Sequence, residues 1–182
     1  IFFDDYHVRF ENGQRASLQL TEFLRNNLLP TDLVAVMYPL TPVSDVRFSR
    51  NHDAVIAQVE EFYGRKYRYE PENLFEQEYW NYPPQVVEQI RNQVSLSALN
   101  GLMVRLGGLR EGRKSVLLVS EGYTNYVPPQ LRESMDGSFN PARLDPNAAE
   151  SPIEETHQLF SDSSLILRLR ELFQVANRFN TS

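Results

Sequence analysis

The sequence predicts an α/β domain in which a mainly parallel sheet is covered by helices on both faces. Short apolar runs at residues 1–3, 32–38 and 115–119 have the composition of strands that are buried on both sides. Longer amphipathic stretches lie between these runs, and such alternation is typical of parallel sheets with crossover helices. A chain of 182 residues suits a single domain, which we expect to span residues 1–182.

The first half of the chain is expected to contain a strand, a helix and two further strands. The run 1–3 reaches solvent at Asp4. The run 32–38 ends at Pro39, and residues 43–49 alternate apolar and polar side chains as a half-exposed edge strand does. The helix between the first two strands follows Asn12-Gly13-Gln14, and its predicted apolar face consists of Ala16, Leu20, Phe23, Leu24 and Leu28.

A second helix is expected between Asn51, a plausible N-cap, and Gly64. Residues 62–82 have many aromatic residues and no clean period, so we interpret them as an aromatic-rich insertion. Its rings either cover the core or form a surface for a partner, since Tyr and Trp are enriched in interfaces. Pro83-Pro84 then opens a long helix that ends at Gly107-Gly108.

The last part of the chain begins with the clearest buried strand, residues 115–119. Residues 123–160 are expected to form a long Pro-rich loop, and connections of that length are usually functional or disordered. A final helix is expected after residues 161–164, with a face made of Leu165, Ile166, Leu169, Leu172, Phe173 and Ala176.

The composition excludes several classes of protein. Hydrophobic residues make up 41% and charged residues 23% of the chain, so a disordered or fibrous protein does not fit. The net charge of −6 makes nucleic-acid binding unfavourable. Cysteine is absent, which excludes disulfides and a thiol nucleophile. No apolar run is long enough to cross a bilayer, so we expect no membrane insertion.

Acidic residues follow two of the predicted buried strands. Asp4 and Asp5 end the first strand, and Ser120 and Glu121 end the strand at 115–119. If these strands are parallel neighbours, the acids converge on one edge of the sheet, where ligands of open α/β sheets bind. Clustered carboxylates attract hard cations, so these four residues are a candidate site for Mg²⁺ or Ca²⁺. The alternative is that they are solvated acids just beyond strand ends.

Short motifs also occur in a characteristic order: a strand ending in Asp4-Asp5, the run 31–36, Phe48-Ser49 before a helix, the stretch 112–122, and Val175-Ala176-Asn177-Arg178. In combination they resemble von Willebrand factor type A (vWA) domains, and most of all a divergent bacterial set of vWA-related proteins. The resemblance implies a Rossmann-like three-layer sandwich. In that set residues like 175–178 lead into one more core strand, so we expect a sheet that lacks a terminal strand. Export from the cell is also implied.

Standard members of that family bind a protein ligand through a metal-ion-dependent adhesion site, and they have no enzymatic activity. The first segment of that site reads Asp-x-Ser-x-Ser. The matching stretch, residues 4–8, keeps Asp4 but has neither serine, and no threonine stands near Val94-Ser95, where the family pattern has one. Glu121 stands at the last acidic position. The resemblance therefore implies a degenerate adhesion site.

These observations predict a non-enzymatic protein-interaction module that binds its partner at the carboxyl-end edge of the sheet. The residues expected to contact the partner are Tyr6, His7, Tyr79, Trp80 and Tyr123. One alternative is an Mg²⁺-dependent phosphotransfer or receiver-like domain, which would need a lysine close to the acids. Lys114 precedes its strand and is expected at the opposite end of the sheet. Another alternative is an assembly domain whose sheet is completed by another chain, as in a homo-oligomer.

Overall fold

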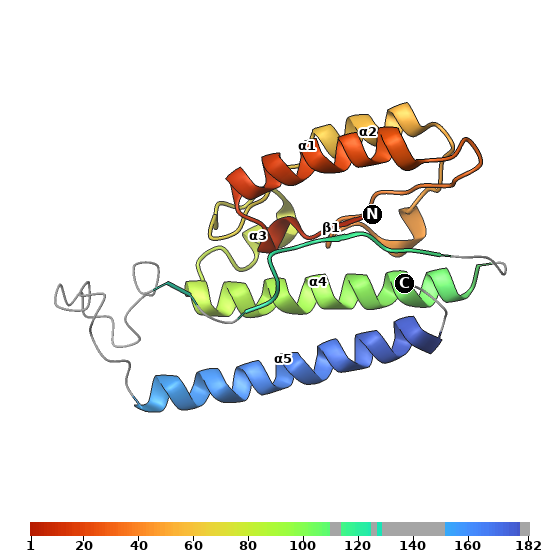
Figure 1. Ribbon diagram of the computed structural model, residues 1–182. Coiled ribbons are helices and arrows are strands. Elements are labelled where there is room, and N and C mark those ends of the chain that lie inside the picture. The colour runs from red at the N-terminus through yellow and green to blue at the C-terminus, as the bar shows by residue number, and fades with distance from the viewer. Residues whose placement is uncertain (110–113, 125–126, 129–151, 179–182) are drawn as a thin grey trace.

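A computed structural model describes residues 1–109, 114–124, 127–128 and 152–178 of the chain (Figure 1). Helices dominate these residues, and the strands are short. The elements are β1 (Phe2–Phe3), a 3₁₀ turn (Asp5–His7), α1 (Phe10–Asn27), a second 3₁₀ turn (Val43–Asp45), α2 (His52–Glu60), α3 (Leu74–Gln77), α4 (Pro84–Gly107), β2 (Leu118–Val119) and α5 (Pro152–Arg178).

Among the described residues the sheet consists of two parallel strands, β1 and β2, with Phe2 opposite Leu118 and Phe3 opposite Val119. The runs at residues 1–3 and 115–119 therefore lie side by side and point the same way, as predicted. The second run is not buried on both sides as expected, because Leu117 and Leu118 are 38% and 46% exposed. The run 32–38 lies along the other side of β1, where the Phe3 amide donates to the Met37 carbonyl at 2.9 Å. It joins β1 only through an isolated bridge at Met37, so the sheet is smaller than expected.

The expected edge strand at residues 43–49 is wrong for most of its length. Residues Val43–Asp45 form a 3₁₀ turn, and the only bridge in this stretch pairs Ser49 with Val34 in antiparallel orientation. The guanidinium of Arg105, on α4, donates to the carbonyl oxygens of Val43 and Val46. These two carbonyl groups bond to the side chain of Arg105, so the backbone of residues 43–46 is held by α4 instead of by a neighbouring strand.

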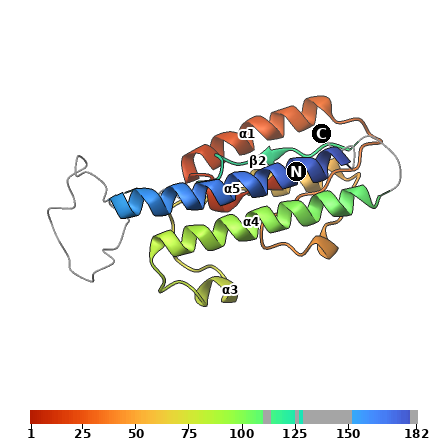
Figure 2. The same cartoon turned by 90° about the horizontal axis from the view of Figure 1, so that it is seen from below.

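The two residues of β1 face opposite sides of the molecule, as neighbouring residues of a strand do. Phe3 packs with Leu24 of α1 and Val59 of α2, whereas Phe2 packs with side chains of α4 and α5. Helices α1 and α2 therefore lie on one side of the strands, and α4 and α5 lie together on the other (Figures 1 and 2). The chain thus combines helices with a small parallel sheet.

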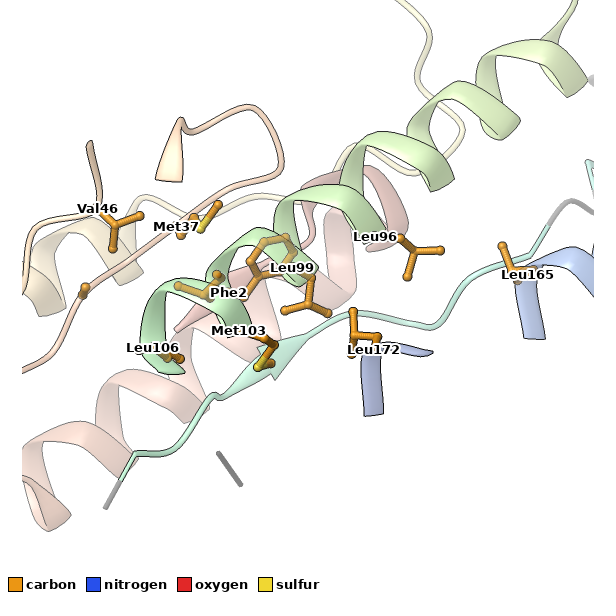
Figure 3. Packing of buried hydrophobic residues seen from close by; sticks show 11 residues of the cluster. Phe2, Met37, Val46, Leu96, Leu99, Met103, Leu106, Leu165 and Leu172 are labelled. Atoms are coloured by element: carbon orange, nitrogen blue, oxygen red, sulfur yellow. The ribbon is translucent and has the colours of Figure 1, made fainter. Parts of the chain in front are cut away.

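Leucine and methionine side chains of α4 gather around Phe2 of β1, and Leu165 and Leu172 approach from α5 (Figure 3). Each of the residues from α4 in this cluster is nearly inaccessible to solvent. The α4 residues are Leu96, Leu99, Leu102, Met103 and Leu106. Burial of such side chains is the main favourable term in folding, so α4 is the central helix of this half of the core.

Helix α1 begins earlier than predicted, and its predicted face is only partly confirmed: Leu24 is buried and Leu20 and Leu28 pack against the core, but Phe23 is 49% exposed. The other buried positions, Gly13, Ser17 and Thr21, lie on a face of small residues that was not predicted. Small side chains allow α1 to approach α2 closely, and the hydroxyl of Ser17 donates to the Val59 carbonyl at 2.7 Å. The apolar pattern missed this face because the contact uses small and hydrogen-bonded residues.

The helix predictions for the rest of the chain had mixed outcomes. Asn51 caps α2 as predicted, because its side-chain oxygen accepts a hydrogen bond from the Ala54 amide at 3.2 Å. Helix α4 begins at Pro84, also as predicted. Helix α5 begins at Pro152, so the loop predicted over residues 123–160 is wrong from that point onward. Residues 125–126 and 129–151 of that loop lie outside the described residues.

Of the predicted apolar face of α5, Leu165 and Leu172 are buried, but Ile166 and Phe173 are about half exposed or more, at 51% and 62%. The helix therefore uses a narrower stripe than predicted, because it packs on α4 along one side only. In the part of the chain that is described, no helix combines the length and the hydropathy that a bilayer crossing requires.

Candidate functional site

The carboxyl ends of β1 and β2 meet at one edge of the sheet. We call this edge the carboxyl rim and define it as residues 4–9, 38–40, 61–68 and 120–123. A hydrogen bond of 3.0 Å from the Glu121 amide to the His7 carbonyl joins the two segments that follow the strands. All four residues predicted as metal ligands lie on this rim, since each directly follows a strand.

Asp4 is completely buried, and each oxygen of its carboxylate has a neighbouring side chain as its partner. One carboxylate oxygen accepts a hydrogen bond from the Ser120 hydroxyl at 3.0 Å, and the other lies 2.7 Å from Nδ1 of His7. The ring of Tyr123 packs edge-on against His7, with ring centroids 4.9 Å apart. Burial raises the pKa of the Tyr123 hydroxyl, and the negative charge of Asp4 adds to this shift. Asp4 therefore anchors the ends of both strands and has no access to solvent.

Asp5 is held by Arg65, which lies in the aromatic-rich stretch. The Nε atom of Arg65 donates to Oδ2 of Asp5 at 2.8 Å, and its Nη2 atom donates to Oε1 of Glu76 at 2.7 Å. The Tyr6 hydroxyl donates to the same Glu76 oxygen at 2.8 Å. Burial opposes ionisation of Glu76, but the hydrogen bonds from Arg65, the Glu72 amide and Tyr6 outweigh it and lower its pKa to about 2. Arg65 is therefore the centre of a buried ionic cluster.

Arg91 of α4 reinforces this cluster from below. Its Nη2 atom donates to the Arg68 carbonyl at 2.6 Å, and its guanidinium lies 4.8 Å from the centroid of the Tyr6 ring. The Arg65 guanidinium lies 5.0 Å from the same ring, so both cations stack on one aromatic side chain. The Arg68 amide donates to the Arg65 carbonyl at 3.0 Å, and Tyr67 within that turn has a left-handed φ of 66°. Residues 65–68 form a turn that is fixed from both sides.

Glu121 has a structural role at the start of α1. Its Oε1 atom accepts hydrogen bonds from the Arg9 amide at 2.8 Å and from the Asn12 side chain at 2.7 Å. Arg9 is the N-cap residue and makes no side-chain capping hydrogen bond, so Glu121 supplies a carboxylate at this helix end and accepts a hydrogen bond from the backbone amide of Arg9. A carboxylate there also interacts favourably with the helix dipole. Lys66 completes the contact, with Nζ 3.4 Å from Oε2 of Glu121.

The acids of the rim do not converge as a metal-binding set. Asp4 faces His7 and Ser120, Asp5 faces Arg65, and Glu121 faces the start of α1. Within the described ranges, no group of three or more His, Asp or Glu side chains is arranged so that it could hold a metal ion. The serine and aspartate are brought together as predicted, but as partners of each other.

Three residues predicted to contact a partner are inaccessible. Tyr6 and His7 are 0% exposed and Tyr79 is 5% exposed, because they pack into the ionic cluster and the core beneath it. Tyr123 is half-buried, whereas Trp80 is 55% exposed. The aromatic stretch thus divides into rings that cover the core and rings that face solvent. The solvent-facing aromatic residues are Tyr63, Phe75, Trp80 and Tyr82.

A cavity of about 250 Å³ opens on the rim beside the ionic cluster. Asp5 and Arg65 line it from the side of the strands, and Tyr38, Leu40, Glu61 and Tyr63 line the remainder. Sequence reasoning missed Tyr38, although it stands at the carboxyl end of a predicted strand, and it missed Arg65, which lies in the aromatic-rich stretch. Arg65 pairs with Asp5 of the rim and with Glu76, and Lys66 pairs with Glu121 of the rim, so both cations are neutralised internally.

Comparisons of this chain with protein-family models, with curated proteins and with solved structures gave no match.

Proposed function

We propose that this chain is a non-enzymatic protein-interaction module, with a vWA-like three-layer architecture, that binds a partner protein at the carboxyl rim. The motif order described above supports the family assignment. The parallel pairing of β1 with β2 supports it further, because it brings the acid-tipped ends of both strands to one edge. The 62–82 stretch, which carries the exposed aromatic residues, contacts that edge through Arg65 and Glu76.

A single observation carries the proposal: a costly buried ionic cluster anchors a segment whose aromatic side chains face solvent. Arg65 is 6% exposed and Glu76 is 2% exposed, although burying charges is expensive even when they are paired. The same segment exposes Trp80 by 55% and Tyr82 by 51%. A rigid backbone that presents large aromatic side chains binds a partner with little loss of conformational entropy.

The acids of the rim favour binding over catalysis. A phosphoacceptor carboxylate must be reachable by its substrate, yet Asp4 is completely buried and bonded to Ser120 and His7. Lys66 does reach the rim, which the sequence did not predict, but its ammonium faces Glu121 and the ring of Tyr67. These side chains support the folded structure, so the phosphotransfer alternative has less support than the interaction module.

The test is selection of peptides that bind the intact chain from a random phage-displayed library. We expect the selected peptides to lose binding when Trp80→Ala and Tyr82→Ala are combined. The matched control combines Leu18→Ala and Phe23→Ala, which remove two exposed apolar side chains from α1. Peptides that tolerate the first pair, or that require the second, would contradict the proposal, as would failure to select any peptide.

The edge of the sheet favours a second candidate, the assembly domain. In the described part of the chain β1 is the only strand paired with β2, and Leu117 and Leu118 are 38% and 46% exposed. An open strand with apolar side chains is a site for pairing with another chain. Sedimentation equilibrium over a range of concentrations tests this candidate. Self-association that Leu118→Lys abolishes would favour it over rim binding, and a monomer at every concentration would exclude homo-oligomeric assembly.

A further inference from the structure

The cavity on the carboxyl rim has the size of a site for one side chain. Its volume of about 250 Å³ is below the roughly 300–1,000 Å³ of pockets that hold whole small-molecule ligands. The cavity opens to solvent, since Leu40, Glu61 and Tyr63 on its border are exposed. Asp5 and Arg65 lie at its inner side and are largely buried, with side-chain exposures of 14% and 7%. A single extended side chain can therefore enter from outside and reach the ionic cluster.

The charges around the cavity favour a cation. Arg65 contributes a guanidinium to the lining, but each of its nitrogen atoms already faces a carboxylate of Asp5, Glu72 or Glu76. Its positive charge is therefore already matched by these acids, which disfavours recruitment of a further anion. The carboxylate of Glu61, in contrast, lies on the border of the cavity and makes no ion pair among the described residues. With Asp5, Glu61 leaves an excess of negative charge in the lining.

The uncharged lining suits a cation on an apolar stem. Tyr38 and Tyr63 contribute aromatic rings, which attract ammonium and guanidinium groups, and Leu40 contributes an apolar surface. Burial raises the pKa of Tyr38 to about 12, with further contributions from the negative charges of Asp5 and Glu61. Lysine and arginine place a charged group at the end of a methylene chain and match such a mixed surface.

A bare divalent cation is a poorer match. Ca²⁺ and Mg²⁺ need several oxygen ligands around one point, and no group of three acidic or histidine side chains among the described residues provides them. Asp5, moreover, is already bonded to Arg65.

From the aromatic and acidic lining and the size of this cavity, we propose that it receives a lysine or arginine side chain of the partner protein. This inference rests on the proposed function and adds the chemistry of recognition. The cation lies between the rings of Tyr38 and Tyr63, its methylene stem passes Leu40, and its charge faces Glu61 and Asp5. The exposed aromatic residues of the 62–82 stretch then contact apolar side chains that flank this residue in the partner.

The test uses blocked tripeptides and the intact chain with isotope-labelled tyrosine. Acetyl-Gly-Lys-Gly-amide and its arginine analogue are expected to shift the ring resonances of Tyr38 and Tyr63, whereas the norleucine analogue, which lacks the charge, is not. Glu61→Gln should weaken the binding by roughly threefold to fivefold, because one exposed charge contact is lost. Glu60→Gln is the matched control, since Glu60 is the adjacent acid and pairs with Arg25 away from the cavity.

Equal binding of the norleucine peptide, or an unchanged affinity in Glu61→Gln, would overturn the inference. Spermidine, a free polyamine, is tested in the same way. If it binds far more tightly than both charged peptides, the cavity serves a small molecule instead of a protein side chain, and the inference is overturned. The phage selection is independent of this result. Selected peptides that need Trp80 and Tyr82 but contain no lysine or arginine would leave the proposed function intact and overturn only the occupant of the cavity.

Discussion

Arg65 binds Asp5 across sixty positions of the sequence, with 2.8 Å between Nε and Oδ2. The contact joins the end of the central strand to the stretch that carries the exposed aromatic residues. Both side chains are largely buried, and both also take part in backbone contacts, because the Arg65 amide donates to the Asp5 carbonyl at 2.7 Å. The rim and the aromatic stretch are therefore one structural unit.

Replacing Arg65 by methionine should strongly destabilise the fold. The change leaves Asp5 and Glu76 without their cation, and removing one partner of a buried ion pair costs about 3–5 kcal/mol. Urea denaturation followed by circular dichroism measures the loss. Arg68→Met is the control, because that side chain is exposed, and a change within about 0.5 kcal/mol is expected. Similar stabilities for the two variants would contradict the role assigned to Arg65.

Acid should weaken the ionic cluster through Glu76. The pKa of Glu76 in the folded chain, about 2, lies below its ordinary value of 4.5, so the ionised carboxylate stabilises the folded state. This contribution is complete above pH 4.5 and is lost as the pH falls toward 2. The free-energy difference between wild type and Glu76→Gln should therefore shrink over that interval.

Asp5 acts in the opposite direction, because burial raises its pKa and the Arg65 charge only partly opposes this. It is present in both proteins, so comparing wild type with Glu76→Gln at each pH isolates Glu76. Chemical denaturation in a pH series gives the two curves, and a difference that stays constant down to pH 2 would refute the pKa assigned to Glu76.

Ser120→Ala should destabilise the junction between the strand ends. The Ser120 hydroxyl donates to the buried carboxylate of Asp4 at 3.0 Å, and hydrogen bonds to charged groups contribute about 1.5–3 kcal/mol. Thermal and urea denaturation should both register the loss. Ser97→Ala on the exposed side of α4 serves for comparison and should have little effect. An equal, small effect of both changes would mean that Ser120 does not hold Asp4.

Gly64→Ala should be among the most damaging small changes in the chain. A Cβ atom at this position would lie 2.1 Å from the Val8 carbonyl oxygen and 2.8 Å from that of Arg9, so the backbone must move. Such overpacking costs about 3 kcal/mol. Gly108→Ala is the control, because the nearest atom to its added methyl would be 3.5 Å away. Differential scanning calorimetry of both variants would measure the contrast, and a tolerated Gly64→Ala would show that α1 and residues 62–64 are less closely packed.

Two neighbouring residues test how α5 packs. Leu172 is 6% exposed within the α4–α5 core, whereas Phe173 is 62% exposed. Leu172→Ala should cost about 2–5 kcal/mol, because it leaves a cavity in the core. Phe173→Ala removes a larger side chain and should cost much less. The reverse order, measured by urea denaturation, would mean that α5 presents a different face to α4.

The sequence predicts the parts of this fold that depend on apolar runs and on caps. The cap at Asn51 and the start of α4 at Pro84 follow from local signals. The pairing of β1 with β2 is not local, and it agrees with the parallel arrangement on which the prediction of the rim depended. The sequence also shows that acidic residues directly follow both strands, so their position at one edge of a parallel sheet could be predicted. What each acid binds was not, because its partners are distant in sequence: Arg65 for Asp5, and the amide of Arg9 for Glu121.

The errors share a physical cause. Residues 43–49 resemble a strand, but Arg105 takes two of their carbonyl groups, and no local pattern reveals a side chain that arrives from a helix. The inward face of α1 includes Ser17 and Gly13, which pack closely because they are small. A prediction based on the spacing of large apolar side chains does not detect such positions. Arg65 and Lys66 stand next to each other in the sequence, and only the fold shows which acids neutralise them.

The pairing of Phe2 and Phe3 with residues 118 and 119 also constrains the order in which this chain can fold. Partners of Phe3 on the α1–α2 side are contributed largely by residues 1–62, so that cluster can collapse while the remainder is still being synthesised. Phe2 must wait for α4 and for a strand more distant in the chain, and closing so long a loop is slow. Until β2 arrives, one side of the central strand remains open, and during that interval the nascent chain is most exposed to misassembly.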